Sequence, residues 1–213
     1  MKIKKIPFCL DELEQVSMLQ KVRTIDPETK YHQVLDCALR LFVKKGYHRV
    51  SIPDIVGASG VSTGAIYNLF GSKENLARTL HQQILTGFQN DFVARLVDCE
   101  TAYDKLRAFA ELVYEKTDHD PITMEYLLFM KHAEFMGDMA PICMTGPFRL
   151  IRQIVTDGMA GGEIRQGDYF ISAVSYTGAI LRPAQLKLEC VLEGSLCDMA
   201  DELIANAWAA IKA

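Results

Sequence analysis

Apolar residues recur along most of the chain with the period of a helix. Leu35, Ala38, Leu39 and Phe42 are three or four positions apart, and a longer stripe over residues 76–96 has the same spacing. No stretch alternates between apolar and polar residues for more than a few positions, as a half-buried strand would. The pattern therefore predicts an all-α protein.

Capping residues, prolines and glycines predict where the helices begin and end. Asp26 followed by Pro27 is typical of a helix start, with the aspartate as N-cap, and Gly46 is a stop signal. Ser51, Thr101, Asp168 and Ser195 each precede an apolar run as further N-caps, whereas Pro183 predicts a helix end. About nine helices result, over residues 26–45, 51–58, 63–70, 73–97, 101–117, 120–136, 146–161, 168–182 and 195–212.

Two short predicted helices meet at a turn that contains Gly60. This arrangement is a helix-turn-helix, in which the second helix lies in the major groove of DNA. Gly60 allows a positive φ, and Ile55, Val61 and Ile66 can fill the small core between the helices. The region over residues 51–70 is therefore a candidate DNA-binding module.

Several side chains of this region suit contacts with DNA. Ser62, Thr63 and Gly64 at the start of the second helix would bring short side chains and N–H groups near phosphates and base edges. Asn68 offers the donor and acceptor that match adenine, and Lys73 could meet a phosphate.

The charge distribution agrees with a DNA-binding module at one end. The chain of 213 residues has a net charge of −4, so it is not basic as a whole. Residues 30–81 hold seven basic and three acidic residues, whereas residues 82–213 hold 11 basic and 19 acidic ones. A small basic segment on an acidic remainder is typical of a nucleic-acid-binding domain joined to another domain.

The motifs of this region resemble a known family. They are Ala38-Leu-Arg-Leu-Phe42, Gly46-Tyr47, Ser51-Ile-Pro-Asp-Ile55, Gly60-Val-Ser-Thr-Gly-Ala-Ile-Tyr67, Phe70 and Gly71-Ser-Lys-Glu-Asn-Leu76. Residues 27–77 resemble the DNA-binding domain of the TetR family of bacterial transcriptional regulators. Leu69, where the family often has a histidine or an aromatic residue, and Pro53, inside the first short helix, depart from that pattern.

The resemblance implies a set of DNA contacts and a domain organisation. The candidate DNA-binding residues are Ser51, Ser62, Thr63, Gly64, Tyr67, Asn68 and Lys73. Residues 1–25 form an N-terminal extension with a possible amphipathic helix, residues 26–72 the DNA-binding domain, and residues 73–213 a ligand-binding and dimerisation body, which matches the family only in layout. The predicted long helix from Lys73 to Val97, with a bend at Gly87, would connect the two domains as a lever.

The resemblance also implies partners: a double-stranded DNA operator, a second copy of the chain and a small effector. Residues 169–182 and 195–212 are expected to pair in a homodimer. The apolar residues expected in that interface are Val174, Ile180, Leu181, Leu196, Met199, Leu203 and Trp208.

Five of the nine methionines lie between Met124 and Met144. They can be ordinary core, or they can line an adaptable apolar pocket, because methionine repacks around varied shapes. The candidate ligand-binding residues are Tyr103, Tyr126, Phe129, Met130, His132 and Phe148. They predict a small apolar or aromatic effector that releases the operator.

Other classes of function lack support in the sequence. Gly60-Val-Ser-Thr-Gly64 matches the nucleophile motif of serine hydrolases, but that motif needs a preceding strand, so we expect no catalytic residues and no enzyme. We expect no cofactor, no metal, no membrane span and a cytoplasmic location. The six cysteines are expected to be buried thiols, with a redox pair of Cys190 and Cys197 as the alternative. An alternative function is a helical ligand-binding or interaction protein that acts through a protein partner without operator binding.

Overall fold

The computed structural model describes residues 26–132 and 145–213, and the predicted N-terminal amphipathic helix lies outside this range. The described residues form nine α-helices and one 3-10 turn, so the all-α prediction is confirmed. The elements are α1 (Pro27–Lys45), η2 (Tyr47–Arg49), α2 (Ile52–Ser59), α3 (Thr63–Phe70), α4 (Lys73–Arg95), α5 (Ala102–His119), α6 (Pro121–Phe129), α8 (Gly146–Ala160), α9 (Tyr169–Leu188) and α10 (Ala200–Ala209).

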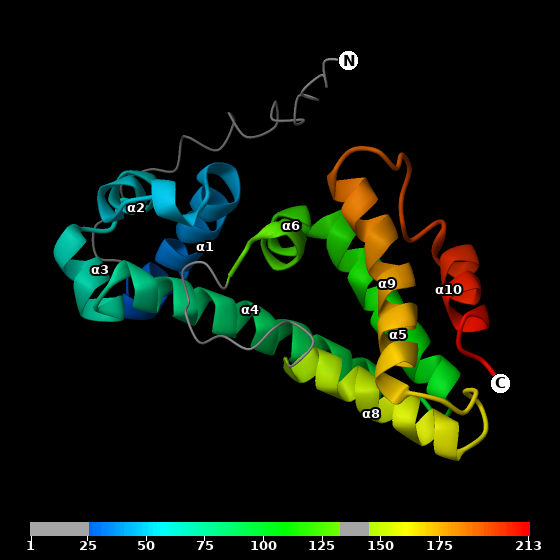
Figure 1. Cartoon of the computed structure of the whole chain (residues 1–213). Coiled ribbons are helices and arrows are strands. Elements are labelled where there is room, and N and C mark those ends of the chain that lie inside the picture. The colour runs from blue at the N-terminus through cyan, green and yellow to red at the C-terminus, as the bar shows by residue number, and fades with distance from the viewer. Residues whose placement is uncertain (1–25, 133–144) are drawn as a thin grey trace.

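The helices form a small head and a larger body (Figure 1). We call residues 26–72, with α1 to α3, the head, and residues 73–213 the body. The long helix α4 begins in the head and extends to the far end of the body, where α8 lies along it. Helices α5 and α9 pack on each other above this pair, and α10 packs against α9. Helix α6 lies between the head and the rest of the body and also contacts α1.

Local signals explain the head. Gly60 ends α2 with a φ of +68°, which confirms the predicted use of glycine in the turn. Ser51 and Asp54 form a complete capping box at the start of α2, and the Ser62 hydroxyl accepts a hydrogen bond from the Ala65 N–H at the start of α3. Backbone groups at both helix starts are thereby satisfied within a few residues of sequence.

The head and the body have separate apolar cores that meet at α6. The head core contains the predicted Ile55, Val61 and Ile66, all buried, and extends to Leu80 of α4. Tyr126 of α6 belongs to this head core, whereas its neighbours Met124 and Leu127 belong to the body core. One short helix therefore contributes side chains to both cores.

Helix α9 continues past Pro183, so the predicted end at Arg182 is wrong. Proline inside a helix removes one hydrogen bond and costs about 3 kcal/mol. Ala184 and Leu188, beyond the proline, are buried in the body core, and this packing offsets the local cost.

The last helix and the end of α6 also differ from prediction. Ser195 does not cap α10, which begins at Ala200; its hydroxyl donates to Asp118 of α5 instead, at 2.8 Å. Helix α10 ends at Ala209 because the chain then pairs with the segment at Ile164. Helix α6 ends at Phe129 rather than near Met136, and residues 133–136 lie outside the described range.

Two smaller predictions are also corrected. Asp26 stands at the N-cap of α1, but its side chain makes no capping hydrogen bond there. The expectation of buried thiols fails for the four described cysteines, because Cys37 and Cys99 are half-buried and Cys190 and Cys197 are exposed. Both exposed thiols are free and lie in the connection between α9 and α10.

Candidate DNA interface and ligand cavity

Helix α3 presents a polar face to solvent. Ile66 and Phe70 are buried in the head core, whereas Thr63, Gly64 and Asn68 are exposed. Tyr67, with 48% of its side chain exposed, lies on the same open side. An exposed asparagine and tyrosine on a short second helix are the groups with which such a motif can reach base edges.

The start of α2 has its polar groups already paired. Ser51 donates its hydroxyl to Asp54 and accepts the Asp54 N–H, while Lys45 donates to the same carboxylate at 3.1 Å. These bonds hold the pKa of Asp54 at about 2, with the Ser51 hydroxyl bond as the main cause. The Ser51 side chain therefore fixes the start of α2.

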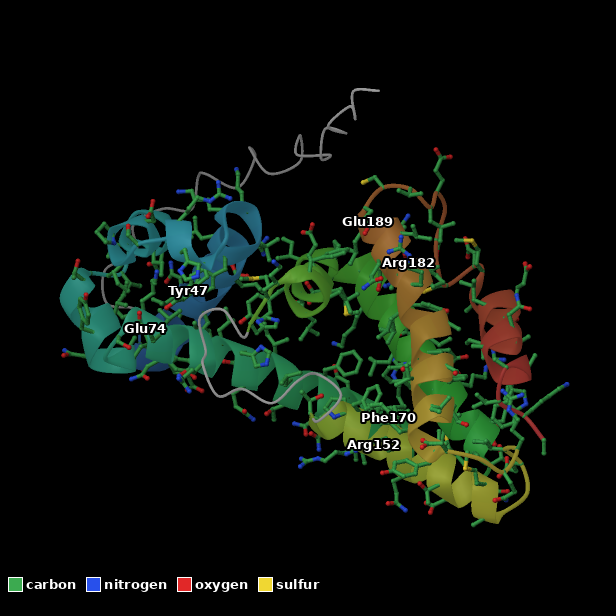
Figure 2. The ribbon with its side chains drawn as sticks, viewed as in Figure 1. Tyr47, Glu74, Arg152, Phe170, Arg182 and Glu189 are labelled. Carbon is green, nitrogen blue, oxygen red and sulfur yellow. The ribbon has the colours of Figure 1, made fainter. Side chains whose placement is uncertain are left out.

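Lys73 joins the head to α4. Its ammonium donates to the carbonyl oxygens of Tyr47 and Val50, at 3.3 and 3.0 Å, and lies 4.1 Å from the centre of the Tyr47 ring. Tyr47 in turn donates its hydroxyl to Glu74, and Figure 2 shows these two side chains between η2 and α4. Burial, followed by the Glu74 charge, raises the pKa of Tyr47 to about 12. Lys73 thus holds η2 on α4, in addition to the phosphate contact predicted for it.

An apolar cavity of about 90 Å³ lies between the helices of the body. Residues of five helices or their ends form its walls, so a ligand that enlarges the cavity moves these helices relative to one another. Its walls are Leu85 and Phe88 of α4, Phe109 and Val113 of α5, Met124, Leu127 and Leu128 of α6, Thr145, Pro147 and Phe148 at α8, and Thr177 and Leu181 of α9.

The structure does not gather the six predicted ligand-binding residues into one wall. Phe148 lines the cavity. Tyr103 packs edge-on against Trp208 of α10, with ring centres 5.3 Å apart, and Phe129 is 41% exposed at the end of α6. Tyr126, Met130 and His132 lie where α6 meets the head. Helical spacing alone could not separate these locations, because the cavity wall is assembled from five elements.

A buried polar cluster at the head–body junction was missed by sequence reasoning. The His81 ring on α4 lies 4.3 Å from the His132 ring and 6.0 Å from the Tyr126 ring, measured between ring centres. Burial, followed by the His132 charge, lowers the pKa of His81 to about 4, and burial also lowers the pKa of His132. Both imidazoles are therefore neutral at pH 7, and a lone histidine within an apolar stripe of α4 was the available signal.

Helix α9 leaves an apolar strip uncovered. Ile171 is 65% and Val174 is 44% exposed, and the exposed Gly178 follows on the same side of the helix. Figure 2 shows Phe170 at the start of this helix and the Arg182–Glu189 ion pair near its end. The uncovered strip is therefore apolar at its start and charged at its end.

The residues predicted for the dimer interface have mixed locations. Ile180 and Leu196 are buried in the core of their own chain, so they are not available to a partner. Only Val174 among the seven is largely exposed. The others, Leu181, Met199, Leu203 and Trp208, are half-buried against the body core.

Comparison with known proteins identifies the class. The family model of bacterial regulatory proteins of the TetR family matches residues 34–80. The fatty acid metabolism regulator protein of Bacillus subtilis (strain 168) is 26% identical over 141 residues, 65% of this chain and 72% of that protein. The regulator TtgR of Pseudomonas putida is 26% identical over 78% of this chain and 84% of its own length.

Solved structures share the fold. A TetR-family regulator from Marinobacter aquaeolei VT8 has a TM-score of 0.74 at 17% identity, over 87% of this chain and 96% of its own. The regulator FadR of Bacillus subtilis, solved in complex with stearoyl-CoA, has a TM-score of 0.72 at 19% identity, over 84% and 98%.

The molecule is a helix-turn-helix transcriptional regulator with a helical body, and it is not an enzyme. Residues 34–80 carry the DNA-binding domain of the TetR family of bacterial regulatory proteins, and the relatives that extend into the body are transcriptional regulators. Regulators of this family bind operators and small effectors and are dimers. Every helix in the described ranges is too short or too polar to span a membrane. The family assignment favours the regulator over the alternative of a protein without operator binding.

Proposed function

We propose that this chain is a cytoplasmic homodimeric repressor, which leaves a palindromic operator when a small apolar or aromatic molecule enters the body cavity. The exposed polar face of α3 carries the DNA-binding part of this proposal. Thr63, Tyr67 and Asn68 face solvent on a helix whose other side is anchored in the head core.

The apolar strip of α9 supports the homodimer. Ile171, Val174 and Gly178 lie three or four positions apart, so a second α9 could pack along them and bury this strip. Two copies would then present two recognition helices to half-sites related by a twofold axis. Val174→Asp should convert the dimer to a monomer in light scattering, whereas Ala94→Asp, at an exposed position of α4, serves as the charge control.

The cavity supports an apolar effector. Its walls are almost entirely hydrocarbon, and a volume of about 90 Å³ holds only a small group. A larger effector would extend beyond this volume, and we propose that it separates α4 from α5, α6, α8 or α9 as it enters. Because the first turns of α4 pack in the head core, this movement changes the spacing of the two recognition helices. The effector and the operator therefore favour different conformations of the dimer. The B. subtilis relative is named for fatty acid metabolism, which favours an acyl or comparable apolar chain.

A gel-shift experiment tests operator binding directly. The wild-type chain should bind DNA from upstream of its own coding sequence more tightly than unrelated competitor at moderate salt. Equal affinity for both DNAs would refute the proposal.

A second variant tests the cavity. Leu128→Trp should fill it and abolish release of the operator by an identified effector, while operator affinity stays close to wild type. Leu192→Trp, at a half-buried leucine that does not line the cavity, is the matched control. If both variants responded to the effector as the wild type does, the effector would bind elsewhere.

A further inference from the structure

A second hollow lies outside the body cavity, between the head and α6. It is an open groove of about 510 Å³, within the size range of small-molecule sites. Residues 42–49, at the end of α1 and in η2, form one wall, and residues from Glu125 to Lys131 form the other. None of its lining residues belongs to the recognition helix α3. We call it the junction groove.

The rim of the junction groove is basic. Lys44, Arg49 and Lys131 are exposed along it, and His48 lies beside them. The Arg49 guanidinium lies across Gly46, whose Cβ position would be 4.0 Å from it, so the charge is held over the end of α1. This local excess of cations stands against a net charge of −4 for the whole chain. The groove therefore attracts anions where the average surface of this protein repels them.

Within the described part of the chain, one acid lines the groove beside Lys44 and Arg49. Glu125 is the acid that lines the groove, and burial raises the pKa of its carboxyl group. The nearby Asp54 carboxylate accepts from Lys45 and from Ser51, so it is already compensated. Lys44 and Arg49 line the groove and are exposed.

The floor of the junction groove is apolar. Phe129 is 41% exposed there, next to the half-buried Met130 and the buried Phe42. A cationic rim over an aromatic and methionine floor suits a ligand with one anionic group and one apolar part. Inorganic phosphate or a chloride ion would leave this floor uncovered.

We propose that the junction groove is a second effector site, which takes an amphipathic anion: a carboxylate, sulfonate or phosphate joined to an aromatic or aliphatic group. The proposal rests on the ligand response proposed above. An occupant would touch the end of α1 on one side and the end of α6 on the other. It would thereby set the position of the head against the body, independently of the body cavity.

The test is a fluorescence titration of the full chain with two probes of similar shape. Anilinonaphthalene sulfonate carries an anionic group, and phenylnaphthylamine is its uncharged counterpart. Lys44→Gln/Arg49→Gln should weaken binding of the sulfonate about tenfold and leave the neutral probe unchanged. Phe129→Ser should weaken the sulfonate by a similar factor. Both changes are at exposed side chains, and circular dichroism verifies the fold.

Two controls make the result decisive. Arg149→Gln/Lys212→Gln removes the same charge from positions outside the groove and should leave sulfonate affinity within about twofold of wild type. Leu128→Trp, which fills the body cavity, should also leave it unchanged. An equal loss in both charge-matched double variants, or a loss caused by Leu128→Trp, would overturn the proposal.

The titration needs no DNA, so its outcome is separate from that of the gel shift. If the chain bound no operator, the proposed function would fail while the titration still reported on the groove. If it does bind one, saturating sulfonate should change operator affinity in the wild type. The Lys44→Gln/Arg49→Gln variant should show no such change, and an equal change in both would overturn the regulatory role of the groove.

Discussion

The head and the body use their surfaces in opposite ways. The head buries Ile66 and Phe70 and leaves polar groups of α3 exposed, so its candidate interface is an outer face set by one helix. The body encloses its candidate ligand site between five elements, with Phe88 and Phe148 turned inward. A recognition surface can therefore be built from local sequence, whereas a cavity depends on the packing of distant segments.

Helix α6 shows where the two regions meet. Tyr126 is buried in the head core, while Met124 and Leu127 pack in the body core and line the cavity. A shift of α6 caused by a cavity ligand would therefore also move Tyr126 within the head core. This connection is shorter than the path along α4, and the predictions below test how strongly it couples the regions.

The largest expected effect comes from removing one fully buried phenylalanine in each region. Phe42→Ala in the head and Phe92→Ala in the body should each cost about 3–5 kcal/mol of unfolding free energy, because each removes a fully buried ring from an apolar core. Because Tyr126 joins the cores, we expect both variants to shift one common unfolding transition in calorimetry. Two separate transitions would show that the head and the body unfold independently.

The buried cluster of His81, His132 and Tyr126 should make the protein less stable in mild acid. The pKa of His81 is about 4 in the folded chain, below its ordinary value of 6.5, so the unfolded chain takes up the proton first. Unfolding free energy should therefore fall as the pH drops from about 6.5 towards 4, by up to about 3 kcal/mol. Urea unfolding at several pH values measures this slope. His81→Leu should flatten it, and an unchanged slope would assign the acid sensitivity to other groups.

Asn68→Ala should separate base readout from general DNA affinity. If Asn68 makes a bidentate contact with adenine, the variant should lose about 1–3 kcal/mol of operator binding and little binding to random DNA. Asn90→Ala, at an exposed asparagine of the body helix α4, is the control and should bind like wild type. An equal loss of affinity for both DNAs would indicate a phosphate contact instead.

The smallest effects compare two capping boxes. Ser51→Ala at α2 and Thr101→Ala at α5 should each lower the unfolding free energy by about 1 kcal/mol, because each removes the acceptor for an N–H of the first turn. Urea unfolding should give similar losses. Only Ser51→Ala should also weaken DNA binding, since Ser51 is one of the predicted DNA contacts. A matching loss of DNA binding in Thr101→Ala would mean that the effect passes through stability alone.

Local chemistry in the sequence determined most of the head and many helix ends. Gly60 takes a positive φ because the turn requires it, and Ser51, Thr101 and Asp168 cap helices because their oxygens reach N–H groups two or three residues away. These interactions span a few residues, so a single sequence contains all the information that they need.

Tertiary structure decided the remaining helix ends and the location of the candidate ligand sites. Helix α9 continues beyond Pro183 because Leu188 is buried against distant helices. Ser195 does not cap a helix as predicted but donates a hydrogen bond to Asp118, which is far away in sequence. The same reason explains the ligand sites. Helical periodicity identifies apolar residues, but only the packed molecule separates Phe148 in the cavity from Tyr126 in the head core and Phe129 in the junction groove. Which face of a helix meets which partner is set by long-range burial, and the spacing of residues along one chain does not encode it uniquely.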